Sequence, residues 1–457
     1  MNRAIADGAT PKKGVLSTIF FTVLMDLIGF SIIFPLFPAM LEHYLAHEQP
    51  GGVFYNLVDF LRSLDGESGG YYLPVLFGGV LGTLYSALQF VFAPIWGRLS
   101  DRIGRRPVLL LTLTGVAASY VLWFFAGSFT LLILARFLGG IMAGNISVAT
   151  AAIADVTTRE NRARGMALIG IGFGIGFTFG PALGGALSLV HLNEHFPSLT
   201  AYGVQPFSAA AAGAFLLSLL NLVWVYRKFD ETLASGPDAA SKTSTARYRT
   251  IDPRKLFGPQ GIPGVHRAHL IYFVFFLAFS GMEFTLVFLA AERFGYTPTD
   301  NAWMFVFVGL VMAFVQGGIV RRMGPKTREK NLALAGVILT IPGFVVTGLC
   351  EGSGGLYLGL GLLAAGGALV TPSLSSLVSL LTPADRQGEI LGIFRSLGAL
   401  ARAIGPIIAC VVYWRYGSGT PYVAGAILLL LPLFLVLGLP RPEKKTEPVA
   451  AESSPAP

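Results

Sequence analysis

The sequence predicts an all-α membrane protein whose twelve transmembrane helices form two pseudo-symmetric six-helix bundles. Three observations lead to this fold class. Hydrophobic residues make up 53% of the 457 residues and charged residues only 13%, about half the share that is usual in a soluble domain. Apolar runs of about 20 residues, long enough to span a bilayer as helices, recur along the chain. One long polar segment, residues 227–267, separates six of these runs from the other six.

The individual runs are apolar on all sides. A membrane β-strand would instead alternate apolar and polar residues, so the pattern favours helices over a barrel. In chain order, the predicted helices cover residues 15–44, 71–96, 107–126, 129–152, 165–190, 206–226, 268–291, 301–320, 331–350, 355–380, 388–414 and 420–439.

The Lys and Arg residues between the runs predict the orientation, because cytoplasmic loops are enriched in both. Most of the 33 Lys and Arg residues fall on the side that holds both termini, and only Arg62, Arg293 and Arg415 fall on the other side. We therefore expect both termini to be cytoplasmic. This distribution also explains the net charge of +8, which does not indicate nucleic-acid binding.

The two halves resemble each other. Residues 144–185 and 369–410 align so that Gly180-Pro181 meets Gly405-Pro406. Two similar six-helix halves around a central cavity are a transporter architecture. The predicted segments are an N-terminal bundle (1–226) with an amphipathic extracytoplasmic helix in its insert (45–70), a cytoplasmic linker (227–267), a C-terminal bundle (268–440) and a disordered cytoplasmic tail (441–457).

Five ionisable residues lie well inside predicted helices: Asp26, Arg136, Glu283, Arg395 and Arg402. A charge at the bilayer centre costs roughly 2.5–3.5 kcal/mol on insertion scales, so these residues should face a polar cavity or each other. Asp26 and Arg136 are within reach of each other, either as a static ion pair or as a proton-titrating carboxylate with its counter-charge. Glu283 is expected either to bind substrate or a proton, or to pair with Arg395 or Arg402.

Helix 165–190 carries glycine at every fourth position, which places a smooth stripe on one face. Such stripes let two membrane helices approach closely. Close packing is one interpretation, and a seal against proton leak is the other. The stripe and its adjoining proline are Gly172, Gly176, Gly180, Pro181 and Gly184.

The segment GRLSDRIGRRP (97–107) is strongly charged between two uncharged runs. We predict a tight cytoplasmic turn that acts as a gate. Asp101 would accept hydrogen bonds at the positive N-terminus of helix 388–414, near Gln387 and Gly388, when the cytoplasmic side is closed. The residues of this predicted gate are Gly97, Asp101, Arg102, Gly104 and Arg105.

Several motifs resemble one family. GRLSDRIGRRP resembles the loop signature of the major facilitator superfamily. DLIGFSIIFPLFP (26–38), RFLGGIMAGN (136–145) and GIGFGIGFTFGPALGG (170–185) resemble motifs of its tetracycline/drug:proton antiporter-like branch. The resemblance covers about residues 15–440. One departure is Asp230, which stands where the family's proline is expected.

The resemblance implies a secondary transporter that exports a small amphipathic organic compound or drug in exchange for protons. Asp26, Arg136 and Glu283 would couple transport to the proton gradient, and no cofactor is expected. The alternative is an importer of a small metabolite, proton-coupled or facilitative, in which Arg395 and Arg402 clamp an anionic substrate. The residues expected to line the substrate cavity are Asn145, Glu283, Gln316, Arg395 and Arg402.

Other classes of function are disfavoured. A receptor or scaffold would have little reason to keep five charges inside the membrane, and no nucleophile or metal constellation suggests an enzyme. HLNEH (191–195) matches a metalloprotease pattern, but it lies in a short loop, so no metal site is expected. We expect a monomer in a bacterial inner membrane whose partners are its small-molecule substrate, protons and the lipid bilayer, with no nucleic acid.

Overall fold

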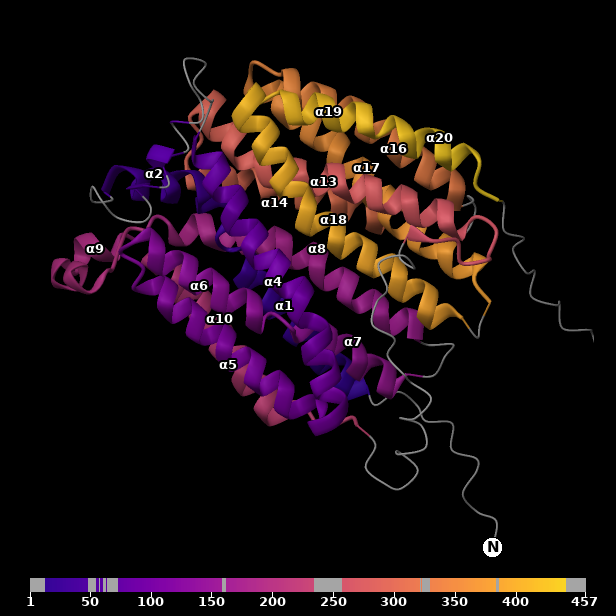
Figure 1. Cartoon of the computed structure of the whole chain (residues 1–457), viewed down its shortest axis with the longest axis horizontal. Coiled ribbons are helices and arrows are strands. Elements are labelled where there is room, and N and C mark those ends of the chain that lie inside the picture. The colour runs from indigo at the N-terminus through magenta and orange to yellow at the C-terminus, as the bar shows by residue number, and fades with distance from the viewer. Residues whose placement is uncertain are drawn as a thin grey trace, which may run out of the picture.

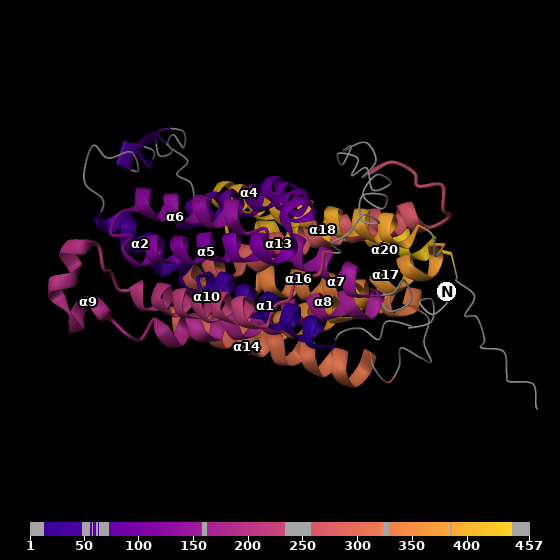
Figure 2. The same cartoon turned by 90° about the horizontal axis from the view of Figure 1, so that it is seen from below.

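The computed structural model describes most of the chain, and within the described residues it contains the twelve predicted membrane-spanning helices. Figure 1 shows the helices of the C-terminal half above those of the N-terminal half. In Figure 2 the helices run along one common direction, with α9 at one end and α20 toward the other. The described residues are 13–47, 55–56, 58–60, 63, 73–157, 162–233, 257–320, 322, 329–383 and 386–440.

Each half contributes six spans, some of them in two pieces. The N-terminal half consists of α1 (Lys13–Ser31), η1 (Phe34–Leu36), α2 (Phe37–His47), α4 (Leu73–Ile103), α5 (Arg105–Phe124), α6 (Phe129–Met142), α7 (Asn145–Val156), α8 (Arg162–Leu187), α9 (Leu192–His195), η3 (Pro197–Tyr202) and α10 (Ser208–Lys228). The C-terminal half consists of α13 (Val265–Phe294), α14 (Pro298–Phe314), η4 (Val315–Val320), α16 (Glu329–Leu349), α17 (Ser353–Leu381), α18 (Gln387–Tyr416), α19 (Thr420–Leu428) and α20 (Leu430–Leu437).

The two ends of the bundle are named here by what lies at them. At the linker end, α1 begins, α10 ends and α4 meets α5. At the far end, α2 ends and the short helix α9 projects (Figure 1). Among the predicted extramembrane segments, linker residues 234–256, the tail 441–457 and most of the insert 45–70 lie outside the described residues. Within the described part of the insert, Val58 is buried and Phe60 is exposed.

The first span is interrupted near the far end. Helix α1 stops at Ser31, a short 3-10 turn follows, and α2 begins at Phe37. Prolines account for this break, because Pro38 has no N–H to donate to the carbonyl of Phe34 and Pro35 opens the 3-10 turn. The interruption leaves the Pro35 carbonyl available to a partner outside the span.

The glycine stripe of α8 packs directly against α1. Ser31 donates a hydrogen bond to the Gly176 carbonyl at 3.0 Å. A side-chain carbon on Gly180 would meet Ser31 Oγ and would lie 2.6 Å from the Ile28 carbonyl oxygen. By contrast, a carbon on Gly172 would meet only ordinary contacts, the nearest at 3.5 Å.

The corresponding contact recurs in the C-terminal half. Ser280 of α13 donates to the Ala401 carbonyl of α18 at 3.2 Å, and a side-chain carbon on Gly405 would meet Ser280 Oγ. Ala401 and Gly405 are the positions that the sequence alignment pairs with Gly176 and Gly180. The internal repeat is therefore visible as the same serine–glycine packing in both halves.

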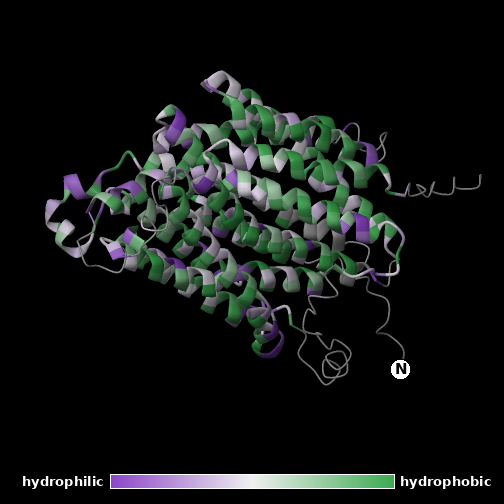
Figure 3. Cartoon of the chain, turned by 45° about the horizontal axis from the view of Figure 1, so that its top comes forward, coloured by the Kyte–Doolittle hydropathy of each residue, from purple (hydrophilic) through white to green (hydrophobic). Residues whose placement is uncertain are grey.

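The outer surface is suited to lipid. Figure 3 shows that the middle portions of the helices are mostly hydrophobic. Large apolar side chains such as Leu220, Leu310 and Phe314 are 61%, 64% and 72% exposed. A soluble protein would not keep so many of these side chains in water, so their exposure agrees with helices surrounded by a bilayer.

Candidate functional site

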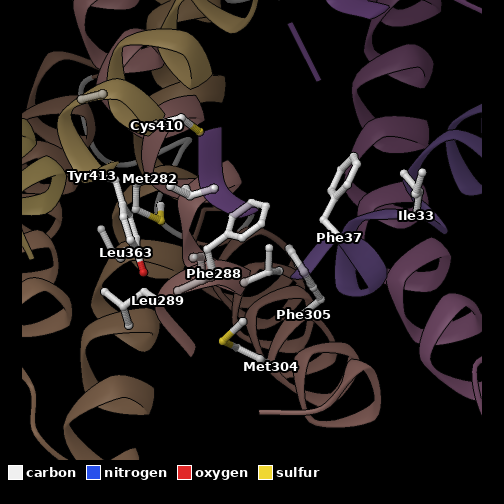
Figure 4. Close-up of a cluster of buried hydrophobic side chains, with 14 of the residues drawn as sticks. Ile33, Phe37, Met282, Phe288, Leu289, Met304, Phe305, Leu363, Cys410 and Tyr413 are labelled. Atoms are coloured by element: carbon white, nitrogen blue, oxygen red, sulfur yellow. The ribbon is translucent and has the colours of Figure 1, made fainter. Parts of the chain in front are cut away.

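The two halves meet in an aromatic contact toward the far end. The Phe37 ring lies 5.3 Å from the Phe284 ring and 6.5 Å from the Phe288 ring, measured between centroids. Figure 4 shows Phe37 and Phe288 in the same buried cluster. Asn301 of α14 adds a polar link, because its Nδ2 donates to the Pro35 carbonyl across the two halves at 3.3 Å. Toward the linker end, α7 packs against α1, α4, α5 and α8, all of its own half.

The fourth span breaks between α6 and α7, and this break positions Asn145. The break leaves backbone carbonyl groups without a hydrogen bond inside the helix, and two side chains of α4 donate to them. Trp96 Nε1 donates to the Ile141 carbonyl at 2.6 Å, and Gln89 Nε2 donates to the Ala143 carbonyl at 3.1 Å. Asn145 is the first residue of α7, which begins after the break. Its side chain therefore points toward α1 and does not continue the face of α6.

Asp26 is half-buried in α1 and is bonded to Asn145. The Asn145 Nδ2 donates to Asp26 Oδ1 at 3.1 Å. Thr112 of α5 donates to the Oδ1 of the same amide. Asn145 is fully buried, so it lies here as a partner of Asp26 and does not line an open surface. Thr112 was not among the residues selected from the sequence, because no sequence pattern relates it to Asp26.

Arg136 is buried against aromatic rings. Its guanidinium carbon lies 5.3 Å from the centre of the Tyr85 ring and 5.8 Å from the centre of the Phe37 ring. Cation–π attraction of this kind is worth more when the cation is desolvated. Among the described residues, no ion pair joins Arg136 to Asp26, and the Arg136 Nε has no hydrogen-bond partner. In this conformation the ring faces and the Asn145 amide take the places that the expected ion pair would fill.

The C-terminal half carries its own charges in the middle of α13 and α18. Glu283 is half-buried and interacts electrostatically with Arg402. The Arg402 guanidinium lies 5.3 Å from the centre of the Phe276 ring. Arg395, two turns earlier on α18, is exposed, and so is Gln316 in the π-helical segment η4. Glu283 and Arg402 thus interact through their charges, and the direct ion pair expected from the sequence stays a prediction.

The predicted gate turn is shorter than expected. Helix α4 continues through Asp101, and only Gly104, with φ of 107°, separates it from α5. Asp101 accepts from Arg105 at 2.5 Å, and Arg105 also donates to Asp155 of α7 at 2.9 Å and to Ser100 at 2.7 Å. These bonds tie the linker ends of three helices of one half together.

The remaining residues of the predicted gate are Gly97, Arg102 and the expected partners of Asp101 on α18. A side-chain carbon on Gly97 would lie 2.9 Å from Ser147 Oγ, so glycine is needed there for α4 to approach α7. Arg102 is exposed. The side chain of Gln387 and the surroundings of Gly388, the expected partners of Asp101, are not described, so that latch stays a prediction for the closed state.

Glu231, just beyond α10, caps the start of α5. Its carboxylate accepts from the backbone N–H groups of Arg105 at 2.9 Å and Arg106 at 3.0 Å, and from those of Thr232 and Leu233. Partial burial would raise the pKa of Glu231, but these four backbone hydrogen bonds outweigh it and lower the pKa. The sequence analysis missed this residue, because the α5 N–H groups that it caps lie more than a hundred residues earlier.

We expect Glu231→Ala to lower the melting temperature, since it leaves N-terminal N–H groups of α5 without an acceptor. Loss of a helix cap costs about 1 kcal/mol. The adjacent exposed Asp230→Ala is the control and should change little. Because the pKa of Glu231 is lowered on folding, its contribution is present above the ordinary value of 4.5 and is lost as the pH falls through the folded value. Equal melting temperatures for both variants across this range would contradict the capping role.

Within the part of the chain that the structure describes, no group of three or more His, Cys, Asp or Glu side chains is arranged to hold a metal ion. Cys350 and Cys410 are buried free cysteines. The site chemistry is therefore that of isolated charges, amides and aromatic rings.

Comparison with known proteins gives one family. The sequence model of the Major Facilitator Superfamily matches residues 19–406 and 328–457 of this chain. Among curated relatives, the chain is 35% identical over 453 residues to the major facilitator superfamily domain-containing protein 10 of Mus musculus, covering 95% of each chain. It is 28% identical to the class B tetracycline resistance protein of Escherichia coli, covering 90% of this chain and 94% of the relative.

Solved structures agree with this result. The crystal structure of the human organic anion transporter MFSD10 (TETRAN) matches with a TM-score of 0.69 and 35% identity, covering 93% of this chain and 100% of that one. A D-xylose–proton symporter matches with the same TM-score of 0.69 at 16% identity, covering 96% and 100%, which shows the shared fold alone. The relatives are transporters and not enzymes. The mammalian relatives are more similar than the bacterial ones, so a bacterial inner membrane is not supported.

Proposed function

This chain belongs to the Major Facilitator Superfamily, and from that premise we propose that it exports an amphipathic organic anion in exchange for protons by alternating access. The excess of Lys and Arg at the linker end supports a cytoplasmic position for that end. The aromatic contact between the halves then lies on the outer side, so this conformation is closed outward. The opposite conformation would require the Phe37–Phe284 contact to separate.

The observation that carries the proton coupling is the placement of Asp26. It is an acid in the middle of a membrane helix, and its hydrogen-bond partner, Asn145, is a neutral amide. A carboxylate without a bound cation can take up and release a proton as its surroundings change. Arg136 lies over the ring of Tyr85, a residue of α4. We propose that this arginine is the counter-charge that approaches Asp26 in the other conformation.

The positive charges of α18 support an anionic substrate. Arg395 and Arg402 lie in the middle of a membrane span, and Arg402 is placed over the Phe276 ring. A guanidinium beside an aromatic face suits a ligand that carries both a negative group and a ring. The related human protein is described as an organic anion transporter, which agrees with this substrate class.

An inward proton gradient would supply the energy for the proposed export. A proton moving inward down a membrane potential of 100 mV supplies about 2.3 kcal/mol per charge, in addition to the pH term. Exchange for an outgoing compound uses this energy directly. The location we propose is a multi-pass position in a membrane that carries such a gradient, with the protein acting as a monomer.

The substrate proposal is tested by Arg402→Gln in proteoliposomes. For an aromatic sulfonate, we expect KM to rise about tenfold or more, because a charge-assisted contact is worth roughly 1.5–3 kcal/mol. An aromatic cation of similar size should not show this increase. Arg415→Gln, on the same helix but at its exposed far end, is the control. If Arg402→Gln weakens the sulfonate and the cation equally, Arg402 has a structural role and the anion proposal fails.

A further inference from the structure

Asp26, Asn145 and Thr112 form a continuous chain of polar contacts across α1, α7 and α5. The Asn145 amide lies in the centre, with its Nδ2 toward Asp26 at 3.1 Å and its Oδ1 toward the Thr112 hydroxyl. Asn145 and Thr112 are both fully buried. A buried amide that has a partner on each side is sensitive to the protonation state of either partner.

The observed arrangement fits an ionised Asp26. A carboxylate can only accept hydrogen bonds, so it needs the NH₂ group of the amide. The amide oxygen then faces Thr112, whose hydroxyl must supply its single proton in that direction. Every member of the chain is satisfied in this state.

The same three groups can also satisfy a protonated Asp26. If the Asn145 amide turns by 180°, its Oδ1 accepts the new carboxyl proton and its NH₂ group donates to the Thr112 oxygen. The hydroxyl proton of Thr112 then has an acceptor of its own, because the Val108 carbonyl lies 2.9 Å away on the preceding turn of α5. Asp26 gains one proton, and the amide and the hydroxyl keep theirs.

We propose that Asn145 and Thr112 are positioning residues that act as a reversible hydrogen-bond relay, which satisfies Asp26 in both of its protonation states. The relay explains how a half-buried acid can exchange a proton without leaving the buried polar atoms of Asn145 and Thr112 unpaired, which would be costly. It rests on the proposed function, in which Asp26 is the proton site.

The other ionisable groups around Asp26 do not offer this exchange. Tyr85 of α4 and Tyr120 of α5 interact with it electrostatically, and Arg136 of α6 lies over the Tyr85 ring. Helix α8 faces α1 with its glycine stripe. Asn145 therefore provides the hydrogen bond to Asp26, Tyr85 and Tyr120 interact with it electrostatically, and Arg136 lies against the Tyr85 ring.

The test is the pH profile of proton-coupled transport of an aromatic sulfonate in proteoliposomes. Asn145→Ala should shift the midpoint of the profile to higher pH by about one unit, because the charge-assisted hydrogen bond that the ionised carboxylate loses is stronger than the neutral one that the protonated acid loses. Thr112→Val removes one hydrogen bond from each protonation state. It should lower the rate several-fold and move the midpoint by less than about half a unit.

Two controls complete the experiment. Thr112→Ser keeps the hydroxyl and should restore the rate. Thr114→Val removes a hydroxyl of the same helix that bonds only its own Leu110 carbonyl, at 2.8 Å, and should leave the profile unchanged.

Three results would overturn the relay: an unmoved midpoint in Asn145→Ala, a shift in Thr112→Val as large as that in Asn145→Ala, or no rescue by Thr112→Ser. If one of these results is found while Asp26→Asn still abolishes proton coupling, the relay is wrong but the proposed role of Asp26 as the proton site stands. If Asp26→Asn retains full coupling, the proposed function of Asp26 fails with it.

Discussion

The Asp26→Asn protein is expected to lose substrate-driven proton movement almost completely while it retains downhill exchange of substrate. Asparagine keeps the shape of the side chain but has no proton to release at any physiological pH. Substrate binding should persist, because the arginines proposed to hold the anion lie on α18 in the other half. The two activities are measured in the same proteoliposomes, one with an enclosed pH-sensitive dye and the other with a labelled substrate.

The control for this variant is Glu42→Gln, an exposed acid on α2 in the same span. It should keep both activities. Full proton coupling in Asp26→Asn would move the proton site to Glu283, the half-buried acid of α13, and would leave Asp26 and Asn145 as a structural pair.

Gly180→Ala is expected to impair folding and transport together. The added carbon would meet Ser31 Oγ and would lie 2.6 Å from the backbone oxygen of Ile28, which cannot move aside without shifting α1. Overpacking of this kind typically costs about 1–3 kcal/mol. Gly172→Ala, on the same stripe, meets only ordinary contacts and should be tolerated.

The measurement is the melting temperature of the detergent-purified protein, followed by transport after reconstitution. A Gly180→Ala protein as stable and active as Gly172→Ala would show that α1 and α8 do not need to pack this closely. A stable but proton-leaky Gly180→Ala protein would instead support the sealing interpretation of the stripe.

The sequence predicted the twelve spans and the glycine stripe because both depend on local patterns. Length and hydropathy define a span wherever it lies. Spacing by four places Gly176 and Gly180 on one helix face, whatever that face contacts. The structure adds only that the partner is α1 and that Gly172 lies in a less crowded position.

The site could not be predicted to the same extent, because it depends on where helices break and rotate. The Asn145–Asp26 bond requires the interruption of the fourth span, which Trp96 and Gln89 stabilise from another helix. The expected Asp26–Arg136 ion pair was inferred from charge and depth, which do not account for the aromatic faces that surround Arg136.

The turn between α4 and α5 also differs from its prediction, because it too depends on a residue that is distant in the sequence. Its charges were correctly recognised as a group, but the acceptor that caps α5 is Glu231, which lies 126 residues beyond Arg105. A helix that starts one residue after a glycine needs a cap from elsewhere, and the sequence does not say where that cap originates.

The most direct test of proton-coupled export uses the wild-type protein in proteoliposomes loaded with an aromatic sulfonate and a dextran-coupled pH-sensitive dye. A sulfonate stays ionised and does not itself carry protons through the lipid. On dilution into sulfonate-free buffer, exchange for protons predicts that the interior becomes acidic as the sulfonate leaves, and that the Asp26→Asn protein shows no acidification. An interior that becomes alkaline, or sulfonate efflux without any pH change in the wild-type protein, would contradict the account.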